Sequence, residues 1–399
     1  MYSAAAMPTS TLISKHRLIG LYALTAVLMV GYGAIFSLLA EIRNTFGFSA
    51  TGVGFIGAAA FISGFIAQLG LSRYADLGYG SLMMKAGLLF CIAATAWMVF
   101  ADSLPEWITS RGALGFGAGM VRPAIKRLVF IDNPANAGYA LGVLAAYETA
   151  GFLIGPVIAA FVNTWFGLSE TFVLLTILLI IVFPLVVGVH VPAAKTPPGK
   201  AILLELIKLP AMQSCLAMGA AFWITMGVFE VIWAIFLSDL GATQIFIGLS
   251  MSLFGLPMVF ISPRAGSLAQ RRGPLRVAIL SIGVAILCMF SYGFIDNIWV
   301  ICIPLCIHAI ADAFTMPATQ FAVARASGED AIASGQGLFG AIGMLIAAVT
   351  ASAGGWLYDL SGASGLWWIS ASAMIVLLLI AWWRGGDLRQ PPRTHDKAV

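Results

Sequence analysis

Twelve long apolar stretches divide this chain, and basic residues cluster in every second gap between them. Each stretch is about 19 to 28 residues long, and a helix needs about 20 residues to cross the hydrocarbon core of a bilayer. A soluble chain of 399 residues could not bury so many continuous apolar helices. The pattern therefore predicts an all-α membrane protein with twelve transmembrane helices and little chain outside the bilayer.

Composition supports this class. The chain is 60% hydrophobic and only 10% charged, whereas soluble domains carry about 25% charged residues. The basic residues lie at span ends, so the net charge of +4 does not indicate nucleic-acid binding. We place the spans at residues 18–40, 50–71, 81–101, 107–129, 139–163, 168–190, 211–238, 245–263, 275–295, 298–321, 332–355 and 364–383.

The placement of lysine and arginine predicts the orientation, because cytoplasmic loops carry an excess of both. We number each gap by the span before it. Of the 21 basic residues, Arg43 alone lies in an odd-numbered gap, and Arg111 lies within span four. The others lie at the termini, in the even-numbered gaps or at span ends beside those gaps. We expect a multi-pass protein of the cytoplasmic (inner) membrane with both termini in the cytoplasm. Lys15 and Arg17 precede a run of full span length, so we expect no cleaved signal peptide.

The spans divide into two halves that repeat with an offset of about 194 residues. We expect an N-terminal six-helix bundle over residues 1–190, a cytoplasmic linker over 191–210, and a C-terminal six-helix bundle with a cytoplasmic tail over 211–399. The linker is rich in proline, glycine and lysine, which is typical of a loop. Parallel repeats of this kind are one of the symmetry plans of secondary transporters.

The loops after spans two and eight carry related motifs. Residues 72–80 read SRYADLGYG and residues 266–274 read GSLAQRRGP. They resemble the Gly-x-x-x-Asp-basic-x-Gly-basic-basic signature of the major facilitator superfamily. The second copy has Gln270 where an acid is usual, and the first has Ser72 where the first glycine is usual and lacks the bases after the acid. The gating-loop candidates are Arg73, Asp76, Gly266, Arg271, Arg272 and Gly273.

The resemblance covers nearly the whole chain and implies a major facilitator fold of two pseudo-symmetric six-helix bundles. It implies a central cavity lined by spans one, four, seven and ten. We expect Asp76 to interact near the cytoplasmic ends of the N-terminal half, and Arg271 and Arg272 to do so in the C-terminal half. These contacts would act as a charge latch between the inward-open and outward-open states.

Span five carries the sequence Gly151-Phe152-Leu153-Ile154-Gly155-Pro156. This resembles the Gly-x-x-x-Gly-Pro motif of span five in drug:proton antiporters, with Ala159 and Ala160 in place of its last two glycines. Small residues four apart allow helices to approach closely, so the motif also has a purely structural interpretation. The antiporter-motif residues are Gly151, Gly155 and Pro156.

Ionisable residues inside spans are costly and mark ion or substrate paths by default. The proton-coupling candidates are Glu148 in span five, Glu230 in span seven, and His308 with Asp312, one turn apart in span ten. For each, the alternative is a structural hydrogen bond between helices, and for the His308–Asp312 pair a further alternative is binding of substrate instead of protons. Glu230 and Glu148 are the leading candidates, and the His308–Asp312 pair is the next.

Four further residues are substrate-cavity candidates. Arg111 begins a run with glycines four, six and eight residues later, which resembles the superfamily's span-four signature, and it should face a wet cavity or an acid unless it extends to the outer interface. The others are Tyr32, Trp223 and Trp233, which suit an adaptable apolar cavity. Tryptophans at both ends of span twelve, namely Trp367, Trp368, Trp382 and Trp383, are predicted as interfacial anchors.

The sequence thus predicts a secondary active transporter, most simply a proton-coupled exporter of a drug-like or hydrophobic metabolite, and alternatively a proton symporter or facilitator for uptake of a small organic solute. Its partners would be the small-molecule substrate, protons and the lipid bilayer, with no nucleic acid, cofactor or metal, and we expect a monomer. An enzyme is disfavoured. The Gly362-Ala363-Ser364-Gly365 string is similar to that of rhomboid-like serine proteases, but the only later histidine, His395, is expected across the membrane.

Overall fold

A computed structural model describes residues 15–48, 50–132, 134–196, 198–242 and 244–391. Within these ranges the chain is helical with no β-strand, as the apolar pattern predicts. The first half consists of α1 (Lys15–Phe46), α2 (Ala50–Tyr74), the π-helical turn η1 (Ala75–Tyr79), α3 (Gly80–Met98), α4 (Leu104–Asp132), η2 (Pro134–Asn136), α5 (Ala137–Trp165), α6 (Leu168–Val182) and η3 (Phe183–Val186).

A short helix, α7 (Ile202–Lys208), follows the linker, and the second half repeats the plan. Its elements are α8 (Pro210–Asp239), α9 (Gln244–Arg272), α10 (Pro274–Tyr292), α11 (Cys302–Ser327), η4 (Glu329–Ala331), α12 (Ile332–Arg384) and η5 (Gly386–Arg389). The expected spans eleven and twelve both lie in α12, which turns at Gly362, where φ is 68°. Only glycine adopts this left-handed backbone freely.

Nine helical segments of the described residues are long and apolar enough to cross a membrane. One of them, Phe55–Met98, includes both span two and span three. The segments for spans four and eight fall outside this set. The helix of span four, α4, carries Glu106, Arg111, Arg122, Lys126 and Arg127, and the helix of span eight, α9, carries Arg264 and two arginines at its end. These charged residues make both helices deviate from a simple apolar span.

The outward faces of the helices are strongly apolar. Leu280 is 73% exposed, Leu287 is 70% exposed and Ile181 is 64% exposed. An apolar exterior on this scale is stable against lipid tails and not against water. Trp367 corrects one expectation, because it is fully buried among other aromatic rings, whereas Trp383 at the other end of the last helix is 73% exposed.

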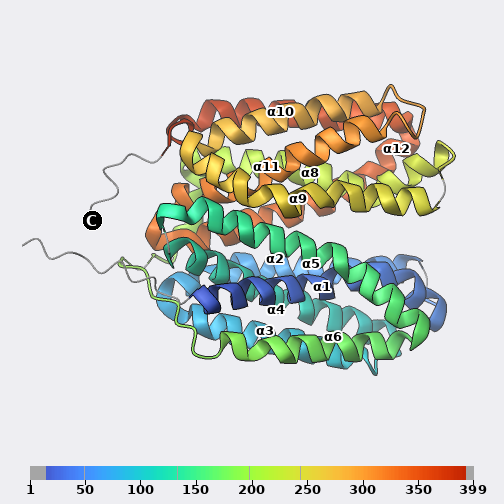
Figure 1. Ribbon diagram of the computed structural model, residues 1–399, viewed down its shortest axis with the longest axis horizontal. Helices are drawn as coiled ribbons and strands as arrows, with labels where there is room; N and C mark the ends of the chain where they lie inside the picture. The colour runs from blue at the N-terminus through green and yellow to red at the C-terminus, as the bar shows by residue number, and fades with distance from the viewer. Residues whose placement is uncertain (1–14, 49, 133, 197, 243, 392–399) are drawn as a thin grey trace, which may run out of the picture.

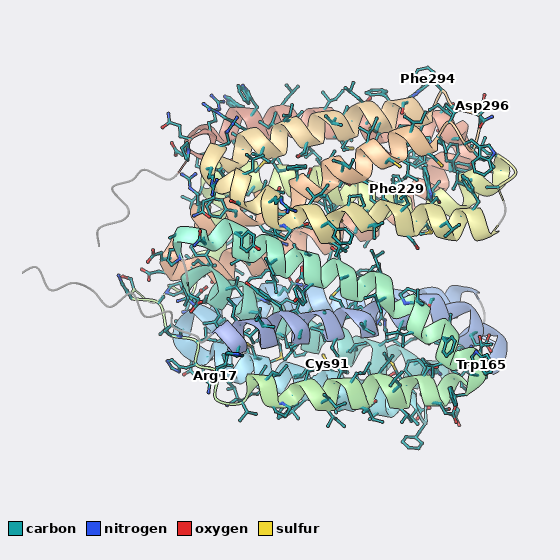
Figure 2. All side chains as sticks on the ribbon, viewed as in Figure 1. Arg17, Cys91, Trp165, Phe229, Phe294 and Asp296 are labelled. Carbon is teal, nitrogen blue, oxygen red and sulfur yellow. The ribbon has the colours of Figure 1, made fainter. Side chains whose placement is uncertain are left out.

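The helices form two bundles, blue to green and yellow to red in Figure 1. Each has its own hydrophobic core. The segment after η3 packs against η1, because the Ala194 N–H donates to the Asp76 carbonyl at 2.8 Å. We call this end of the molecule, which holds η1 and residues 187–196 and 198–201, the linker end. Figure 2 places Arg17 toward this end, with Trp165 and Asp296 at the opposite end.

The two halves keep the same register. α3 spans residues 80–98 and α10 spans 274–292, a separation of 194 residues at both bounds. Each of these helices follows a glycine with a positive φ, namely Gly78 (φ 93°, ψ 0°) and Gly273 (φ 93°, ψ 124°), although the different ψ angles make the two turns dissimilar in detail. The motif glycines thus supply left-handed turns between α2 and α3 and between α9 and α10.

Candidate functional site

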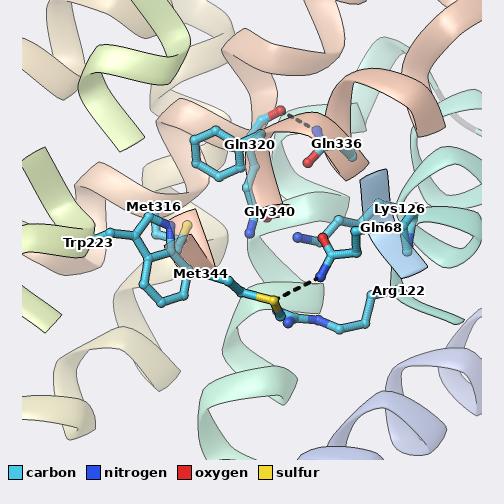
Figure 3. Close-up of a pocket in the computed structure, with 11 residues that line it drawn as sticks. Gln68, Arg122, Lys126, Trp223, Met316, Gln320, Gln336, Gly340 and Met344 are labelled. Atoms are coloured by element: carbon cyan, nitrogen blue, oxygen red, sulfur yellow. Dashed lines mark hydrogen bonds between the residues drawn. The ribbon is translucent and has the colours of Figure 1, made fainter. Parts of the chain in front are cut away.

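A narrow cavity lies between the two halves, close to their contact (Figure 3). Its free volume is about 20 Å³, which is room for about one water molecule. The first half contributes α2 and α4, and the second contributes α8, α11 and α12. The lining residues are Gln68, Arg122, Pro123, Lys126, Trp223, Met316, Gln320, Gln336, Phe339, Gly340 and Met344. The expected spans four, seven and ten line it, together with spans two and eleven, while α1 supplies no lining residue.

The charged wall of the cavity comes from one face of α4. Arg122 and Lys126 are four residues apart, so both side chains leave the helix on the same side. The Arg122 Nε donates to Glu148 Oε1 on α5 at 3.2 Å. Lys126 is buried, and no carboxylate of the described residues lies within 4.0 Å of its ammonium group. Because Arg122 lines the cavity and pairs with Glu148, Glu148 is an ion-paired residue at the edge of the cavity.

The opposite wall is apolar and amide-rich. Trp223, Met316, Phe339 and Met344 supply the apolar surface. Gln68 donates from Nε2 to the Met344 sulfur at 3.6 Å, and this contact joins the two halves across the cavity. Figure 3 shows it together with the bond from Gln336 Nε2 to the Gln320 carbonyl, 2.8 Å long. The wall can contact an apolar body and orient a polar group, as ligand sites usually do.

At the linker end, Asp76 joins the halves directly. Its carboxylate accepts from Arg127 Nη1 at 2.9 Å within the first half. It also accepts from the Ala333 N–H at 2.9 Å, the Ser334 N–H at 2.7 Å and the Ser334 hydroxyl at 2.6 Å, all in the first turn of α12. The first N–H groups of a helix lack intrahelical partners and attract negative charge. Asp76 therefore caps α12 from the opposite half.

Arg127 extends the same contact. Its Nη1 also donates to the Glu329 carbonyl at 2.8 Å, and its Nη2 donates to the Pro192 carbonyl at 3.3 Å in the linker. Arg73 donates from Nε and Nη2 to the Pro198 carbonyl at 3.1 Å and 2.9 Å. The latch thus connects both halves and the linker. The sequence predicted an interaction of Asp76 within the N-terminal half, and the structure adds contacts of Asp76 with the second half.

In the second half, the residue equivalent to Asp76 is Gln270, and its side-chain amide makes the corresponding contact with the first half. Gln270 Oε1 accepts from the Gly138 N–H at 2.9 Å in the first turn of α5, and Nε2 donates to the carbonyls of Pro134 and Ala135 at 3.1 Å and 2.8 Å. Arg271 and Arg272, predicted to form the C-terminal part of the latch, are both exposed and have no ion pair among the described residues. Gln270, and not these arginines, makes the contact between the second half and the first.

Close helix packing explains the glycines of the motifs. A methyl group at Gly266 would overlap the Gly138 carbonyl where α9 meets α5. In α5, a methyl group at Gly151 would overlap the Ala26 carbonyl, and one at Gly155 would overlap the Val30 carbonyl. Pro156 lies against Gly33 of α1. Gly151, Gly155 and Pro156 therefore hold α5 against α1 and do not line the cavity.

His308 and Asp312 lie together inside the second half. His308 Nε2 is 3.6 Å from Asp312 Oδ2, and the Tyr292 hydroxyl is 3.1 Å from His308 Nδ1. Both residues of the pair are fully buried, and aromatic rings pack around the imidazole. Phe229, one of these rings, lies in the second half (Figure 2). Asp312 precedes the cavity residue Met316 by one helical turn.

The other candidates occupy different places. Of the four substrate-cavity candidates, Trp223 lines the cavity. Arg111 is fully buried, with its guanidinium carbon 4.9 Å from the ring centre of Tyr32. Trp233 stacks on Phe229 and donates from Nε1 to the Ser250 hydroxyl at 2.9 Å. Glu230 lies on α8, but its side chain is outside the described residues.

Sequence comparison agrees with this architecture. The sequence profile of the Major Facilitator Superfamily matches residues 21–237 and 215–398. The chain belongs to the Major Facilitator Superfamily. Superfamily members are transporters and not enzymes, so this chain is a multi-pass membrane transporter.

Curated relatives in this superfamily include multidrug resistance proteins. The Multidrug resistance protein MdtG of Dickeya zeae (strain Ech586) is 24% identical over 279 residues, which is 67% of this chain and 68% of that protein. MdtG of Proteus mirabilis (strain HI4320) is 26% identical over 287 residues, covering 68% of this chain and 69% of that protein.

Solved structures show the same fold at low sequence identity. The human organic anion transporter MFSD10 (TETRAN) superposes with a TM-score of 0.75 at 15% identity, covering 92% of this chain and 100% of that one. The transporter FucP in the outward conformation superposes with a TM-score of 0.76 at 14% identity, covering 92% and 98%. These likenesses establish the fold alone.

Sequence reasoning missed the residues of the charged wall. Arg122 and Lys126 lie near the end of span four and were counted among the basic residues that set orientation. Their four-residue spacing was the available signal, because it places two cations on one face of a helix that also carries the superfamily's span-four motif. Gln68, Gln320 and Gln336 carried no signal, since isolated glutamines have no motif.

Proposed function

We propose that this transporter exports a drug-like or hydrophobic metabolite across the cytoplasmic membrane in exchange for protons. The observation that carries the proposal is the cavity between the two halves, which is closed at the linker end by caps from Asp76 and Gln270. A drug-sized ligand needs roughly 300 Å³ or more, so the halves must separate for it to enter. Alternating access by rocking of the two halves meets that need.

The orientation rests on charge. Arg73, Arg127 and Arg272 lie at the linker end, whereas Asp102, Glu106 and Asp296 lie in the opposite gaps. Because cytoplasmic loops are enriched in lysine and arginine, the linker end faces the cytoplasm in this proposal. The structure would then represent a state that is closed toward the cytoplasm. The limits 1–190, 191–210 and 211–399 for the two bundles and their linker belong to the same proposal.

Export of drug-like molecules is supported by the MdtG relatives and by the span-five motif. The apolar wall of Trp223, Met316, Phe339 and Met344 suits a hydrophobic body. Methionine side chains adapt to ligands of different shape, which is useful to a transporter with several substrates.

For proton coupling we place the His308–Asp312 pair first. Glu148 has Arg122 as an ionic partner, whereas Asp312 has only the imidazole beside it, and neither Asp312 Oδ2 nor His308 Nε2 has a hydrogen-bond partner among the described residues. An acid in apolar surroundings without a cation is stable when it carries a proton, and it releases that proton when water or a partner arrives. Its position one turn from Met316 connects it to the cavity.

The test is transport by the purified protein in proteoliposomes against a panel of hydrophobic compounds, with a pH gradient of either sign. Export by antiport predicts that an acidic exterior drives substrate out of a compartment at neutral pH. Uptake by symport predicts movement of substrate and protons in the same direction. Transport that ignores the gradient would identify a facilitator and reject proton coupling.

A further inference from the structure

Among the described residues, the charges around the cavity do not balance. Arg122 and Lys126 supply two positive charges, and Glu148 supplies one negative charge beside them. The cavity residues of α8, α11 and α12 include no acid. We infer that the site takes an organic anion, whose acid group binds between Arg122 and Lys126 while its apolar body lies against the second half. This inference rests on the proposed transport function and specifies its substrate class.

Arg122 is placed to accept such a group. Its Nε is used by Glu148, and neither of its terminal nitrogens bonds any other described residue. A guanidinium binds a carboxylate through two parallel N–H bonds, and Arg122 lines the cavity with both terminal nitrogens available for such a pair. Glu148 fixes the opposite part of the group and so orients that edge. Glu148 thus positions Arg122 and leaves part of its charge for a ligand.

Lys126 adds a second cation with no carboxylate of its own. It is only 7% exposed, and no carboxylate of the described residues lies within 4.0 Å of its ammonium. A buried ammonium is costly unless it is paired. An anionic ligand supplies the missing partner, so part of its binding free energy comes from relieving that cost.

Neutral polar groups lie on the facing wall. The Trp223 indole N–H has no hydrogen-bond partner among the described residues, and the Oε1 atoms of Gln320 and Gln336 have none either. Gln336 Nε2 already donates to the Gln320 carbonyl, whereas the Gln320 amide can turn its nitrogen toward a ligand. The two cations and the indole N–H favour an acid over an ammonium, and the glutamine amides supply neutral polar contacts beside them.

The apolar wall of the cavity indicates what the rest of the ligand is like. The Trp223 and Phe339 rings and the sulfurs of Met316 and Met344 form a surface for an aromatic or aliphatic body. An amphipathic acid with one ring system satisfies both walls. A membrane potential that is negative inside drives such an anion outward, which agrees with export.

A first experiment measures the sign of the cavity charge without needing a substrate. Met316→Cys is made in a protein whose five native cysteines are replaced, and its rates of reaction with an anionic and a cationic methanethiosulfonate reagent are each divided by the rate with free cysteine. The anionic reagent should be favoured on the order of tenfold. Lys126→Gln should remove most of that preference, whereas Lys208→Gln, at an exposed position, should preserve it. A preference for the cationic reagent overturns the inference.

A second experiment compares matched ligands in proteoliposome counterflow. The probes are indole-3-acetate, its amide and tryptamine, and the acid, amide and amine of a naphthalene series. The acids should exchange saturably, and Lys126→Gln should lower their exchange by about 10- to 100-fold, the factor for losing one hydrogen bond to a charged group. Lys126 is chosen because it has no ion pair to lose, so the variant leaves no buried carboxylate unpaired.

The outcomes separate two kinds of failure. If the amines or amides exchange and the acids do not, the inference is wrong while the transport function stands. If no member of either series exchanges, the proposed export of hydrophobic metabolites fails with it. If the acids exchange equally well in the Lys126→Gln and Lys208→Gln variants, the charged wall of α4 is not their binding site and the inference is overturned.

Discussion

Asp76 and Gln270 occupy equivalent loops of the two halves, and each caps the first turn of a helix in the opposite half. Asp76 accepts from Ala333 and Ser334 at the start of α12, and Gln270 accepts from Gly138 at the start of α5. The difference in side chain follows from the surroundings. Arg127 donates to Asp76, whereas the carbonyls of Pro134 and Ala135 face Gln270 and would repel a carboxylate.

Asp76→Asn should loosen the closure at the linker end. The amide nitrogen cannot accept from Arg127 or Ser334, and a buried guanidinium would be left without its carboxylate. We expect the closed state to lose about 2 to 3 kcal/mol relative to the state open at this end. Alkylation of Met316→Cys from the cytoplasmic side should accelerate accordingly. Unchanged alkylation and transport rates would show that Asp76 does not act as a latch.

Gln270→Glu tests the other cap. The new carboxylate would face two carbonyl oxygens at the places where Nε2 now donates. We expect faster labelling from the cytoplasmic side, as for Asp76→Asn, although the family signature usually has an acid in this position. Gln270→Ala is the control, because it removes the bonds without adding charge and should have a smaller effect, about 1 kcal/mol per lost bond. Labelling slower than in the unsubstituted protein would contradict this account.

Gly155→Leu should destabilise the first half. Even a methyl group at this position would overlap the Val30 carbonyl, so α5 must move away from α1. Overpacking of this kind costs typically 1–3 kcal/mol, and here the neighbour is backbone that cannot rotate away. Gly70→Leu is the matched control, since this glycine of α2 is exposed and nothing lies within 4 Å of a methyl group there. Thermal unfolding in detergent should separate the two variants, and equal melting temperatures would refute the packing role.

Much of the fold followed from the sequence because membrane helices are specified by length and hydrophobicity alone. Trp367 shows the limit of that reasoning. It lies near the end of span twelve, as an interfacial anchor would, yet its ring packs between Phe236 and Tyr292. Position along a span does not reveal which face of the helix points inward, because these helices are apolar on every side.

The site was less predictable than the fold. Trp223 was expected in the cavity and lines it, but Arg122 and Lys126 were read as markers of orientation. A basic residue near a span end is equally compatible with the membrane interface and with a cavity, and only the packing of α4 against α5 shows that Arg122 meets Glu148. Likewise Gln270 departs from the family signature, and its role became visible only with the carbonyls opposite it.

Glu106 should not contribute to pH-dependent transport. Hydrogen bonds from the Ser103 hydroxyl and from the N–H groups of Ser103 and Asp102 lower the pKa of Glu106 to about 2 from an ordinary value of 4.5. Because the pKa is lowered, the stabilisation is fully present above pH 4.5 and is lost as the pH falls toward 2. Glu106→Gln should therefore melt lower than the unsubstituted protein by a constant difference between pH 5.5 and 8, and that difference should shrink below pH 4.5. A transport pH profile that moves in this variant would contradict the assignment.

Asp312→Asn should abolish transport driven by a pH gradient while leaving the protein folded and able to exchange substrate across the membrane. The amide retains the shape of the acid beside His308 but cannot load or release a proton in this pH range. His308→Gln should weaken the gradient response in the same direction, because the imidazole lies 3.6 Å from the acid and also contacts the Tyr292 hydroxyl. The measurement compares counterflow without a pH gradient and uptake with a pH gradient, in the same proteoliposomes.

Glu148→Gln tests the competing candidate. Because Glu148 is bound to Arg122, its loss should change substrate affinity more than proton coupling. If Glu148→Gln removes the gradient response and Asp312→Asn retains it, the coupling residue is Glu148, and the His308–Asp312 pair serves only to hold α11 against its neighbours.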